Sequence, residues 1–365
     1  MTAFDKKILA TCVSNAFRAL GKVSPNPLVG CIITKNGEIL SEGIHRTFGG
    51  AHAEVEAINQ ASEDISGSNV YVTLEPCSHF GKTPPCADLL IQKKVARVVI
   101  GCTDPNPLVS GKGIQKLRAA GIEVEVLDNE YFKGFYRRFT KYITTDLPFV
   151  TIKSALTLDG KIAEKSGKSK WITGEKSRKY VHVIRSKHDA ILTSSKTVLS
   201  DDPLLTVRYN NRPSPKRVMM TSKLFFRENY NFFRNTDQKS YIITLESEKN
   251  NTEVLQFINW FQIPVFFVNP DKNGKPDLKE ALKKLHEIGI TSVMVEAGRK
   301  LTAAMINAEL FDELVLFIAP KLMGEGIKLF DGLKNFGLEK AMNLKMTGIR
   351  RLDNDAALFF ARVDQ

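Results

Sequence analysis

The feature that most constrains this chain is a regular alternation of two apolar patterns along its sequence. Short apolar runs predict buried strands, and the segments between them repeat apolar side chains every three or four residues, as amphipathic helices do. Strands that alternate with helices predict layered α/β domains whose functional side chains gather at strand ends. The predicted strands are 28–34, 38–44, 69–74, 95–100, 123–127, 149–154, 190–193, 218–221, 241–244, 265–268, 292–296, 314–318, 344–352 and 356–363. The predicted helices are 4–20, 52–61, 86–92, 111–120, 128–147, 177–186, 278–288 and 301–308.

The length of 365 residues predicts two domains. Residues 128–147 combine charge with aromatic side chains and predict a connecting helix, and Pro148 then precedes a new strand. We therefore place one domain at 1–146 and a second at 147–365. The most polar stretch, 227–251, is expected to be a surface excursion of the second domain.

Composition predicts a globular protein of a reducing compartment. Hydrophobic residues make up 43% and charged residues 25% of the chain, which is ordinary for a soluble domain. No apolar run approaches the ~20 residues that span a membrane, and the first residues lack the pattern of a secretory signal. The five cysteines, an odd number between Cys12 and Cys102, do not suggest a disulfide framework. We expect a cytoplasmic protein without a membrane partner.

The net charge of +12 is unevenly distributed between the two halves. Up to Asp146 there are 17 Lys+Arg against 15 Asp+Glu, whereas the remainder holds 35 against 25. A basic excess in one half indicates an anionic partner there, either nucleic acid or a small phosphorylated ligand. The lysines of the second half are scattered and lack a regular aromatic interleave, which favours the small ligand over nucleic acid.

A possible metal site lies in the first half, where His52-Ala53-Glu54 is followed by Pro76-Cys77 and then by Cys86. Nucleobase deaminases carry H-x-E followed by P-C-x-x-C, with the glutamate as general acid and base. Three protein ligands leave a fourth zinc position open, as in catalytic sites, where the ion lowers the pKa of bound water to ~7. The motif therefore predicts zinc-dependent hydrolytic deamination, with His52, Cys77 and Cys86 as ligands and Glu54 as the proton carrier. The cysteines here are nine apart instead of three.

A structural zinc site is the main rival interpretation. His79 or Cys102 would then supply a fourth ligand and close the site. Glu54 argues against this, because a structural site has no use for a carboxylate between its ligands. Cys12, Cys31 and Cys102 stand in apolar surroundings and are expected to be core residues.

Residues 25–107 resemble the deaminase half of the bifunctional riboflavin-biosynthesis deaminase–reductases. The long spacer between the two cysteines separates this family from transfer-RNA and free-cytidine deaminases, whose cysteines are typically three apart. The matching motifs are Pro25-Asn26-Pro27-Leu28-Val29-Gly30, His52-Ala53-Glu54-Val55, the stretch from Leu74-Glu75-Pro76-Cys77 through Pro85-Cys86, and Asp104-Pro105-Asn106-Pro107.

The second half is similar to the reductase part of the same family. It carries Lys153 to Ala163, Lys170-Trp171-Ile172-Thr173, Asp201-Asp202-Pro203 through Arg208, and Val295-Glu296-Ala297-Gly298 in family order. The resemblance implies an N-terminal cytidine-deaminase-like three-layer α/β domain and a C-terminal dihydrofolate-reductase-like domain. It also implies deamination of a diamino-hydroxy-pyrimidine bearing a phosphoribosylamino group, followed by NADPH-dependent reduction of the ribosyl group to ribityl.

The resemblance also implies roles for individual residues. Asn26 would hold the pyrimidine of the deaminase substrate. In the reductase half, the substrate contacts would be Lys153, Ser169, Arg185, Leu205, Arg208 and Glu296. The NADPH site would be lined by Ala155, Trp171, Thr197, Asp201, Ser222, Gly298, Arg299, Lys300, Leu301, Thr302, Ala303 and Ala304.

Elementary chemistry agrees with several of these roles. Arg185 and Arg208 would grip a 5′-phosphate through bidentate hydrogen bonds. Gly298 lies between a predicted strand and a predicted helix, where backbone N–H groups bind phosphates. No G-x-G-x-x-G follows any strand, so a Rossmann site is not predicted.

Two positions depart from the family pattern. Ala51 precedes His52 where the family usually has proline, which would loosen the turn into the helix. Arg299-Lys300 follows Gly298 where many relatives carry an uncharged pair. These two cations would bind the 2′-phosphate or pyrophosphate of NADPH, or cover the helix start.

Three alternatives to the bifunctional enzyme remain open at this point. The first is a zinc nucleic-acid deaminase with an appended basic binding domain. The second is a structural zinc domain fused to an NADPH-sensing module, and the third is a deaminase that has lost its reductase activity. A homo-oligomer, with a dimer as the first expectation, is predicted on general grounds for a metabolic enzyme.

Overall fold

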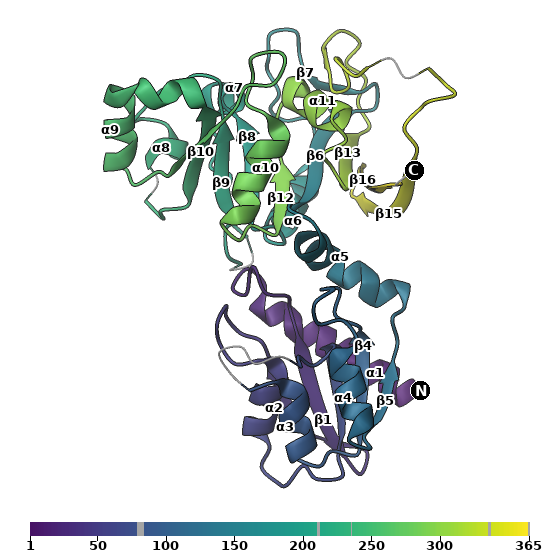
Figure 1. The fold of residues 1–365 in the computed structure, drawn as a ribbon. Helices are drawn as coiled ribbons and strands as arrows, with labels where there is room; N and C mark the ends of the chain where they lie inside the picture. Colours follow the sequence, from purple (N-terminus) through teal and green to yellow (C-terminus); the bar gives the residue numbers. More distant parts are fainter. Residues whose placement is uncertain (79–83, 210–211, 235, 335–336, 364–365) are drawn as a thin grey trace. The chain divides into compact units, whose positions relative to one another are not determined.

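The computed structural model describes residues 1–78, 84–209, 212–234, 236–334 and 337–363. The chain divides into two compact units, Met1–Asp146 and Leu147–Gln365 (Figure 1). Each unit has its own sheet and its own hydrophobic core.

The first unit is built on a five-stranded sheet with the order β2-β1-β3-β4-β5. Its strands are β1 (Gly30–Lys35), β2 (Glu38–Ile44), β3 (Asn69–Leu74), β4 (Arg97–Cys102) and β5 (Glu123–Val126). β1 and β2 form an antiparallel hairpin around Asn36-Gly37, which both adopt the positive φ that this tight turn requires. β3, β4 and β5 are parallel, so their carboxyl ends share one edge of the sheet.

Helices cover both faces of this sheet, which gives three layers. They are α1 (Ala3–Ala16), α2 (Ala53–Gln60), α3 (Cys86–Gln92), α4 (Lys112–Ala119) and α5 (Glu130–Thr144). Alternate strand residues face opposite ways, and the two cores follow that alternation. Ile32 and Tyr71 pack with α1 and α5, whereas Ile33 and Val72 pack with α2, α3 and α4. This half therefore has the three layers that the sequence predicted.

A buried ion-pair network ties the first helix to the sheet. Asp5 forms a capping box with Thr2 at the start of α1. Its carboxylate also accepts two hydrogen bonds from the Arg97 guanidinium, at 3.0 and 3.1 Å, and one from the Tyr71 hydroxyl at 2.8 Å. Arg97 lies on β4 and also contacts Glu125 of β5. The network therefore fixes α1 against the middle of the sheet.

The second unit is built on a mostly parallel sheet, nine-stranded within the described residues, with the order β11-β10-β9-β8-β12-β6-β13-β16-β15. The strands are β6 (Phe149–Thr157), β8 (Ala190–Ser194), β9 (Lys216–Met220), β10 (Ser240–Leu245), β11 (Val265–Val268), β12 (Ser292–Val295), β13 (Glu313–Ala319), β15 (Leu344–Leu352) and β16 (Asp355–Arg362). Among these described strands, β16 runs antiparallel to both of its neighbours, β13 and β15, and the other neighbouring pairs are parallel. A short separate pair joins β7 (Lys161–Ala163) to β14 (Ile327–Lys328).

Helices pack on this sheet around a large aliphatic core that includes Val150, Leu192, Val293 and Leu285. They are α6 (Glu175–Arg185), α7 (Ser195–Asp201), α8 (Asn231–Arg234), α9 (Thr252–Trp260), α10 (Leu278–Glu287) and α11 (Arg299–Asn307). Both units are therefore layered α/β structures, as the sequence predicted.

Several short elements were not predicted from the sequence. α7 follows β8 with no intervening loop, and Val198 and Leu199 are its only apolar residues, so its seven residues show no helical periodicity. The stretch 227–251, expected to be a surface excursion, contains the unpredicted helix α8 and the whole of the buried strand β10, which the sequence had predicted at 241–244. Phe232 and Phe233 are fully buried there, and they anchor this polar segment to the core.

Within the part of the chain that the structure describes, no helix has the length and apolar character needed to cross a membrane.

Candidate active site

The three predicted zinc ligands come from three places at one end of the first unit. His52 is the N-cap of α2, one residue before the helical turn in which the sequence had placed it. Cys77 follows the carboxyl end of β3, and Cys86 is the first residue of α3. Gly43 of β2 lets α2 approach closely, because a Cβ there would lie 2.1 Å from the Ala53 carbonyl oxygen.

The three ligand atoms fit one zinc ion. The Nδ1 atom of His52 lies 3.3 Å from the Cys86 Sγ and 3.5 Å from the Cys77 Sγ. All three ligand atoms lie within 4.8 Å of one another. Tetrahedral zinc with Zn–S bonds of about 2.3 Å and Zn–N bonds of about 2.0 Å places its sulfur and nitrogen ligands roughly 3.5 Å apart. The donor set and its spacing therefore suit zinc.

Of the two cysteine thiols, Cys77 is the one whose ionisation is favoured. The Cys86 thiol and the backbone N–H of Cys86, 3.3 Å from the Cys77 Sγ, both hydrogen-bond to Cys77 and hold its pKa well below the usual thiol range. The same coupling to Cys77, together with burial, raises the pKa of Cys86. The lowered pKa of Cys77 and the raised pKa of Cys86 favour ionisation of Cys77 first, and a metal that binds both sulfurs displaces the remaining thiol proton.

Glu54 lies in the first turn of α2 and is 4% exposed. Burial, with a smaller contribution from the charge on Cys77, raises the pKa of Glu54 to about 7. A carboxyl group with a pKa near neutrality can both accept and donate a proton. It is therefore suited to the proton transfers that hydrolytic deamination requires.

The structure bears on one of the two residues that could have supplied a fourth zinc ligand, Cys102 and His79. Among the described residues, the metal-ligand group around His52 contains only His52, Cys77 and Cys86. Cys102 is buried at the end of β4 and does not belong to this group. His79 lies outside the described residues. Cys12 and Cys31 are buried core residues, as the sequence predicted.

Asn26, the predicted pyrimidine contact, is half-buried and is held by a histidine that the sequence analysis did not single out. The Nδ2 atom of Asn26 lies 3.1 Å from the Nε2 atom of His45. The Nδ1 atom of His45 lies 2.9 Å from the carbonyl oxygen of Ala51, which accepts from it. Burial lowers the pKa of His45, so the neutral ring accepts at Nε2 from Asn26. The only hint in the sequence was the presence of a histidine, His45, seven residues before the ligand His52.

In the second unit, three of the predicted substrate residues form one buried cluster. Glu296 follows β12, and its carboxylate accepts from the Arg185 guanidinium of α6 at 2.6 and 3.1 Å. The ammonium of Lys153 on β6 lies 3.4 Å from the same carboxylate. The side chains of the three residues are only 11–13% exposed. The structure thus brings Lys153, Arg185 and Glu296 together at the carboxyl end of the central strands.

The pKa shifts show which pair dominates this cluster. Burial alone would raise the pKa of Glu296, but the charges of Arg185 and then Lys153 lower it to about 2. Burial lowers the pKa of Lys153 despite its contact with Glu296. The Arg185–Glu296 contact is shorter and bidentate, so it carries most of the stabilisation, and Lys153 is the less well compensated cation.

The remaining predicted substrate residues lie near this cluster or on adjoining loops. Arg185 also donates to the carbonyl oxygen of Thr206 at 3.1 Å, next to buried Leu205. Arg208 is exposed, and its backbone N–H donates to the Nδ1 atom of His182 on α6 at 3.3 Å. Ser169 is half-buried on the loop before α6.

The predicted NADPH residues lie on or just after strands, on α7, in the loop before α6 and at the start of α11. Thr197 follows β8 and Ser222 follows β9, at the same edge of the parallel sheet as Glu296. Ala155 lies on β6, and the carbonyl oxygen of Asp201 accepts from Lys170 at 3.4 Å. Carboxyl ends of parallel strands form the usual ligand edge of such sheets.

The start of α11 offers the backbone donors that a phosphate needs. Gly298 is its N-cap and supplies no side-chain hydrogen bond, and a Cβ at this position would meet nothing within 4 Å. Lys300 is exposed, but Arg299 pairs with Asp331 and is already partly neutralised. The side chains of Leu301, Thr302 and Ala303 are buried, and Ala304 is half-buried, so these residues would meet a ligand mainly through their backbone.

Trp171 is 64% exposed, although a lone tryptophan is more often a core residue. The Arg178 guanidinium lies 4.6 Å from its ring centroid, and Lys321 donates to its carbonyl oxygen at 3.0 Å. An exposed aromatic ring held by a cation is available to a ligand.

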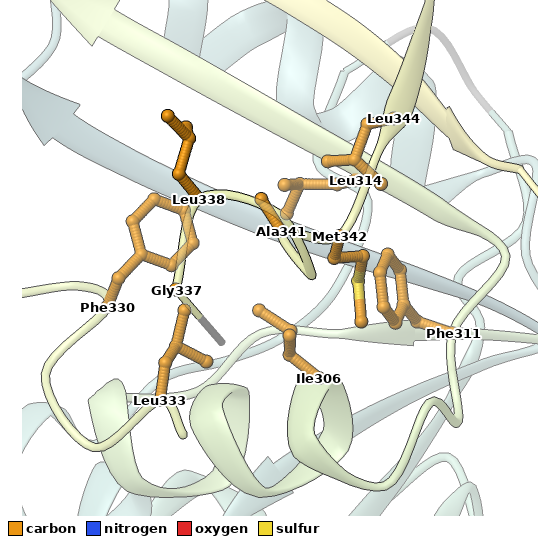
Figure 2. Close-up of a pocket in the computed structure, with 10 residues that line it drawn as sticks. All are labelled: Ile306, Phe311, Leu314, Phe330, Leu333, Gly337, Leu338, Ala341, Met342 and Leu344. Carbon is orange, nitrogen blue, oxygen red and sulfur yellow. The ribbon is translucent and has the colours of Figure 1, made fainter. Parts of the chain in front are cut away.

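An apolar pocket of about 560 Å³ lies elsewhere in the second unit. Figure 2 shows side chains from α11, from β13 and from the segment that leads into β15 converging on it. It contains none of the predicted site residues. Its lining is Ile306, Phe311, Leu314, Phe330, Leu333, Gly337, Leu338, Ala341, Met342 and Leu344.

Comparison with known proteins agrees with the two-part architecture. Residues 2–102 match the family model of the cytidine and deoxycytidylate deaminase zinc-binding region, and residues 148–358 match that of the RibD C-terminal domain. A riboflavin biosynthesis protein RibD from Aquifex aeolicus is 39% identical over 361 residues, which cover 98% of each chain. A second RibD, from Escherichia coli, is 37% identical over 97% of this chain and 98% of its own.

Two solved structures resemble the whole chain. RibD from Acinetobacter baumannii has a TM-score of 0.87 at 33% identity, with 99% of each chain covered. A Thermotoga maritima protein described as a diaminohydroxyphosphoribosylaminopyrimidine deaminase/5-amino-6-(5-phosphoribosylamino)uracil reductase has a TM-score of 0.86 at 34% identity, again over 99% of each chain.

A zinc-binding deaminase fold joined in one chain to an NADPH-dependent reductase fold defines the class of protein as a bifunctional deaminase–reductase. The ligand group in the first unit agrees with that class. The chain belongs to the RibD family of riboflavin-biosynthesis proteins. The resemblance seen in its sequence is thereby confirmed.

Proposed function

We propose that this chain catalyses two successive steps of riboflavin biosynthesis. The first is hydrolytic deamination of 2,5-diamino-6-(5-phosphoribosylamino)pyrimidin-4-one, which is assigned to residues 1–146. The second is NADPH-dependent reduction of the ribosyl group to ribityl, assigned to residues 147–365, which gives 5-amino-6-(5-phosphoribitylamino)uracil. The observation that carries the proposal is the three-ligand group His52, Cys77 and Cys86 beside the buried carboxyl of Glu54.

His52, Cys77 and Cys86 would hold the zinc ion, which supplies the Lewis acidity that activates a water molecule. Glu54 takes a proton from the attacking water and delivers it to the ring nitrogen of the pyrimidine. It then moves the proton of the newly added hydroxyl group to the departing amino group, so that a C=O bond replaces the broken C–N bond and ammonia leaves. A pKa near 7 for Glu54 suits both directions of transfer.

Asn26 would hold the pyrimidine for this reaction. Because its Nδ2 donates one hydrogen bond to His45, the amide orientation is fixed. Its Oδ1 and its second N–H are then the groups that would read the ring edge of the substrate.

In the second unit, Lys153, Ser169, Arg185, Leu205, Arg208 and Glu296 would contact the phosphorylated substrate. The Arg185–Glu296 pair supports this role because it fixes a guanidinium in a buried position at the strand ends. Arg208 is exposed and would supply a second cation for the 5′-phosphate.

NADPH supplies the hydride for the reduction. Ala155, Trp171, Thr197, Asp201, Ser222 and residues 298–304 would bind it, with Gly298 opening the helix start to its phosphates. Lys300 is the better placed of the two neighbouring cations for the 2′-phosphate, because Arg299 already pairs with Asp331.

The compartment and assembly belong to the same proposal. Zinc binding by Cys77 and Cys86 needs free thiols, which favours the reducing cytoplasm. We expect a homodimer that binds neither membranes nor nucleic acid, and sedimentation equilibrium together with an RNA-retention assay at low salt would test these expectations.

The deaminase assignment is tested by Glu54→Gln in the full chain. We expect ammonia release from the diamino-pyrimidine substrate to fall by roughly 10²- to 10⁴-fold with zinc content unchanged, because the proton carrier alone is lost. NADPH oxidation with the deaminated intermediate should persist. Unchanged ammonia release in this variant would contradict the proposal and favour a structural zinc site.

A chelator provides the complementary test. Removal of zinc should abolish ammonia release and leave NADPH oxidation intact, since all three ligands belong to the first unit. Ammonia release without later NADPH oxidation by the wild-type chain would leave only a deaminase.

A further inference from the structure

Glu75 is a buried carboxylate for which the deaminase chemistry has so far given no use. It stands directly before Pro76-Cys77 and is 5% exposed. Its Oε2 accepts from the backbone N–H groups of Asp104 at 3.1 Å and Gly111 at 2.9 Å. Its Oε1 accepts from those of Gly113 at 2.8 Å and Ile114 at 3.2 Å. One side chain therefore satisfies four backbone donors of the segment 104–114.

The Glu75 carboxylate caps the N-terminus of α4, although Glu75 is far from this helix in the sequence. The N-cap of α4 is Gly111, which has no side chain to cap with, and the first turn of α4 contains no acidic residue. A negative group beside a helix N-terminus satisfies its unpaired N–H groups and its dipole. Because Glu75 supplies it, the start of α4 is tied to the chain that carries Cys77, in addition to the backbone hydrogen bond from Lys112 to Val109 within its own loop.

Two backbone contacts make the same connection rigid. The N–H of Glu75 donates to the carbonyl oxygen of Cys102 at 2.9 Å, at the end of β4. A Cβ on Gly113 would lie 2.1 Å from the carbonyl oxygen of Pro76, so only glycine permits the observed packing there. The peptide that leads to the zinc ligand is thus fixed to the segment 102–114 on both sides of Glu75.

The segment held in this way leaves the sheet beside the chain that carries Cys77. β3 and β4 are parallel neighbours, with Leu74 paired to Cys102, so Cys77 and the segment after Cys102 leave the same edge of the sheet. Asp104 and Asn106 are half-buried there, and each folds the segment locally by accepting a backbone N–H two residues on, at 2.8 and 3.1 Å. The segment 104–111, called the wall below, therefore leaves the sheet at the same edge as the chain that carries Cys77, and it includes the polar residues Asp104, Asn106 and Ser110.

We propose that Glu75 is a positioning residue of the deaminase site. Acting through the backbone, it fixes the wall 104–111 relative to Cys77, and so sets how the pyrimidine is aligned with the zinc ligands and Glu54. The inference rests on the proposed deaminase function. Glu75 itself touches neither substrate nor metal, so its loss should disturb alignment and leave zinc binding in place.

Glu75→Gln and Glu75→Ala in the full chain test this role. The amide of glutamine has one acceptor atom, so two of the four backbone donors lose their partner, and alanine removes all four. We expect the deaminase kcat/KM to fall by about 10- to 100-fold, with the larger loss in the alanine variant. Zinc should stay at wild-type stoichiometry by mass spectrometry of metals, and NADPH oxidation with the deaminated intermediate should be unchanged. Hydrogen exchange at the amides of Gly111, Gly113 and Ile114 should accelerate.

Asp5→Asn is the matched control, because it removes another buried carboxylate of the same unit that makes no contact with segment 104–114. It should lower stability while leaving the kcat/KM of the folded protein within twofold of wild type. A Glu75 variant that behaves like Asp5→Asn, or whose activity falls only in proportion to lost zinc, would overturn the proposal. A wild-type chain that releases no ammonia would refute the deaminase function and the inference with it.

Discussion

The Arg185–Glu296–Lys153 cluster allows the effect of one substitution to be worked out in advance. Glu296 is a single carboxylate facing two cations, all three nearly buried. Glu296→Gln keeps the shape of the side chain and removes only its charge. The two cations then lose their common partner in a site that water hardly reaches. We expect the second unit to lose stability at neutral pH.

The size of the loss follows from the pKa of Glu296. A pKa lowered from 4.5 to about 2 corresponds to about 3 kcal/mol of stability above pH 4.5. Removal of one partner from a buried ion pair costs roughly 3–5 kcal/mol in other proteins. The lower end of that range applies here, because burial already lowers the pKa of Lys153, which can release its proton.

The sign of the pH dependence is equally definite. A depressed carboxyl pKa adds stability above the unfolded value of 4.5, and this stability is lost as the pH falls towards 2. The difference between wild type and Glu296→Gln should therefore be full at pH 7 and about half as large at pH 3.

Calorimetry of the full chain without NADPH is the appropriate assay. For a unit of this size, about 3 kcal/mol lowers the Tm of its transition by roughly 6–12 °C. Glu287→Gln, which removes a surface partner of Lys284, is the control and should stay within about 0.5 kcal/mol of wild type. A loss below 1 kcal/mol at pH 7, or an equal loss at pH 3 and pH 7, would refute the reasoning.

Three further predictions concern other contacts. Asp5→Asn should destabilise the first unit by about 1.5–3 kcal/mol at pH 7, because Arg97 and Tyr71 lose a charged acceptor while Arg97 keeps its contact with Glu125. The difference should shrink below pH 4, since the pairing with Arg97 depresses the pKa of Asp5, and urea unfolding across pH checks both expectations. Gly43→Ala should cost about 1–3 kcal/mol and weaken zinc retention in a chelator competition, because its Cβ would push α2 away; unchanged retention would contradict the role given to this contact. Arg178→Ala should raise the KM for NADPH roughly two- to fivefold with kcat unchanged, because Trp171 loses its cation–π partner. Steady-state NADPH oxidation measures this, and an unaltered KM would show that the tryptophan is not a cofactor contact.

The sequence predicted the positions of most long elements because their signals are local. Each of the predicted strands has a counterpart in the structure. In α2 and α10, the apolar residues that predict the helix all belong to the helix itself. α7, α8 and α9 were not predicted, since their apolar residues are explained only by contacts with distant strands, as for Phe232 and Phe233.

The zinc ligands were predictable because few residue types bind zinc, and because His52, Glu54, Cys77 and Cys86 follow one another in the order of the deaminase motif. By itself the sequence thus determined the two-domain α/β organisation and the inventory for deamination and reduction. Only the tertiary structure decided what each charge contacts: that Glu296 joins Arg185 to Lys153, that Arg299 faces Asp331, and that Glu75 gathers four amides of a distant segment. The reason is that apolar periodicity indicates only which side of a helix or strand is buried. The partners of a buried charge lie far away in the sequence, and they come into contact with it only when strands and helices pack together.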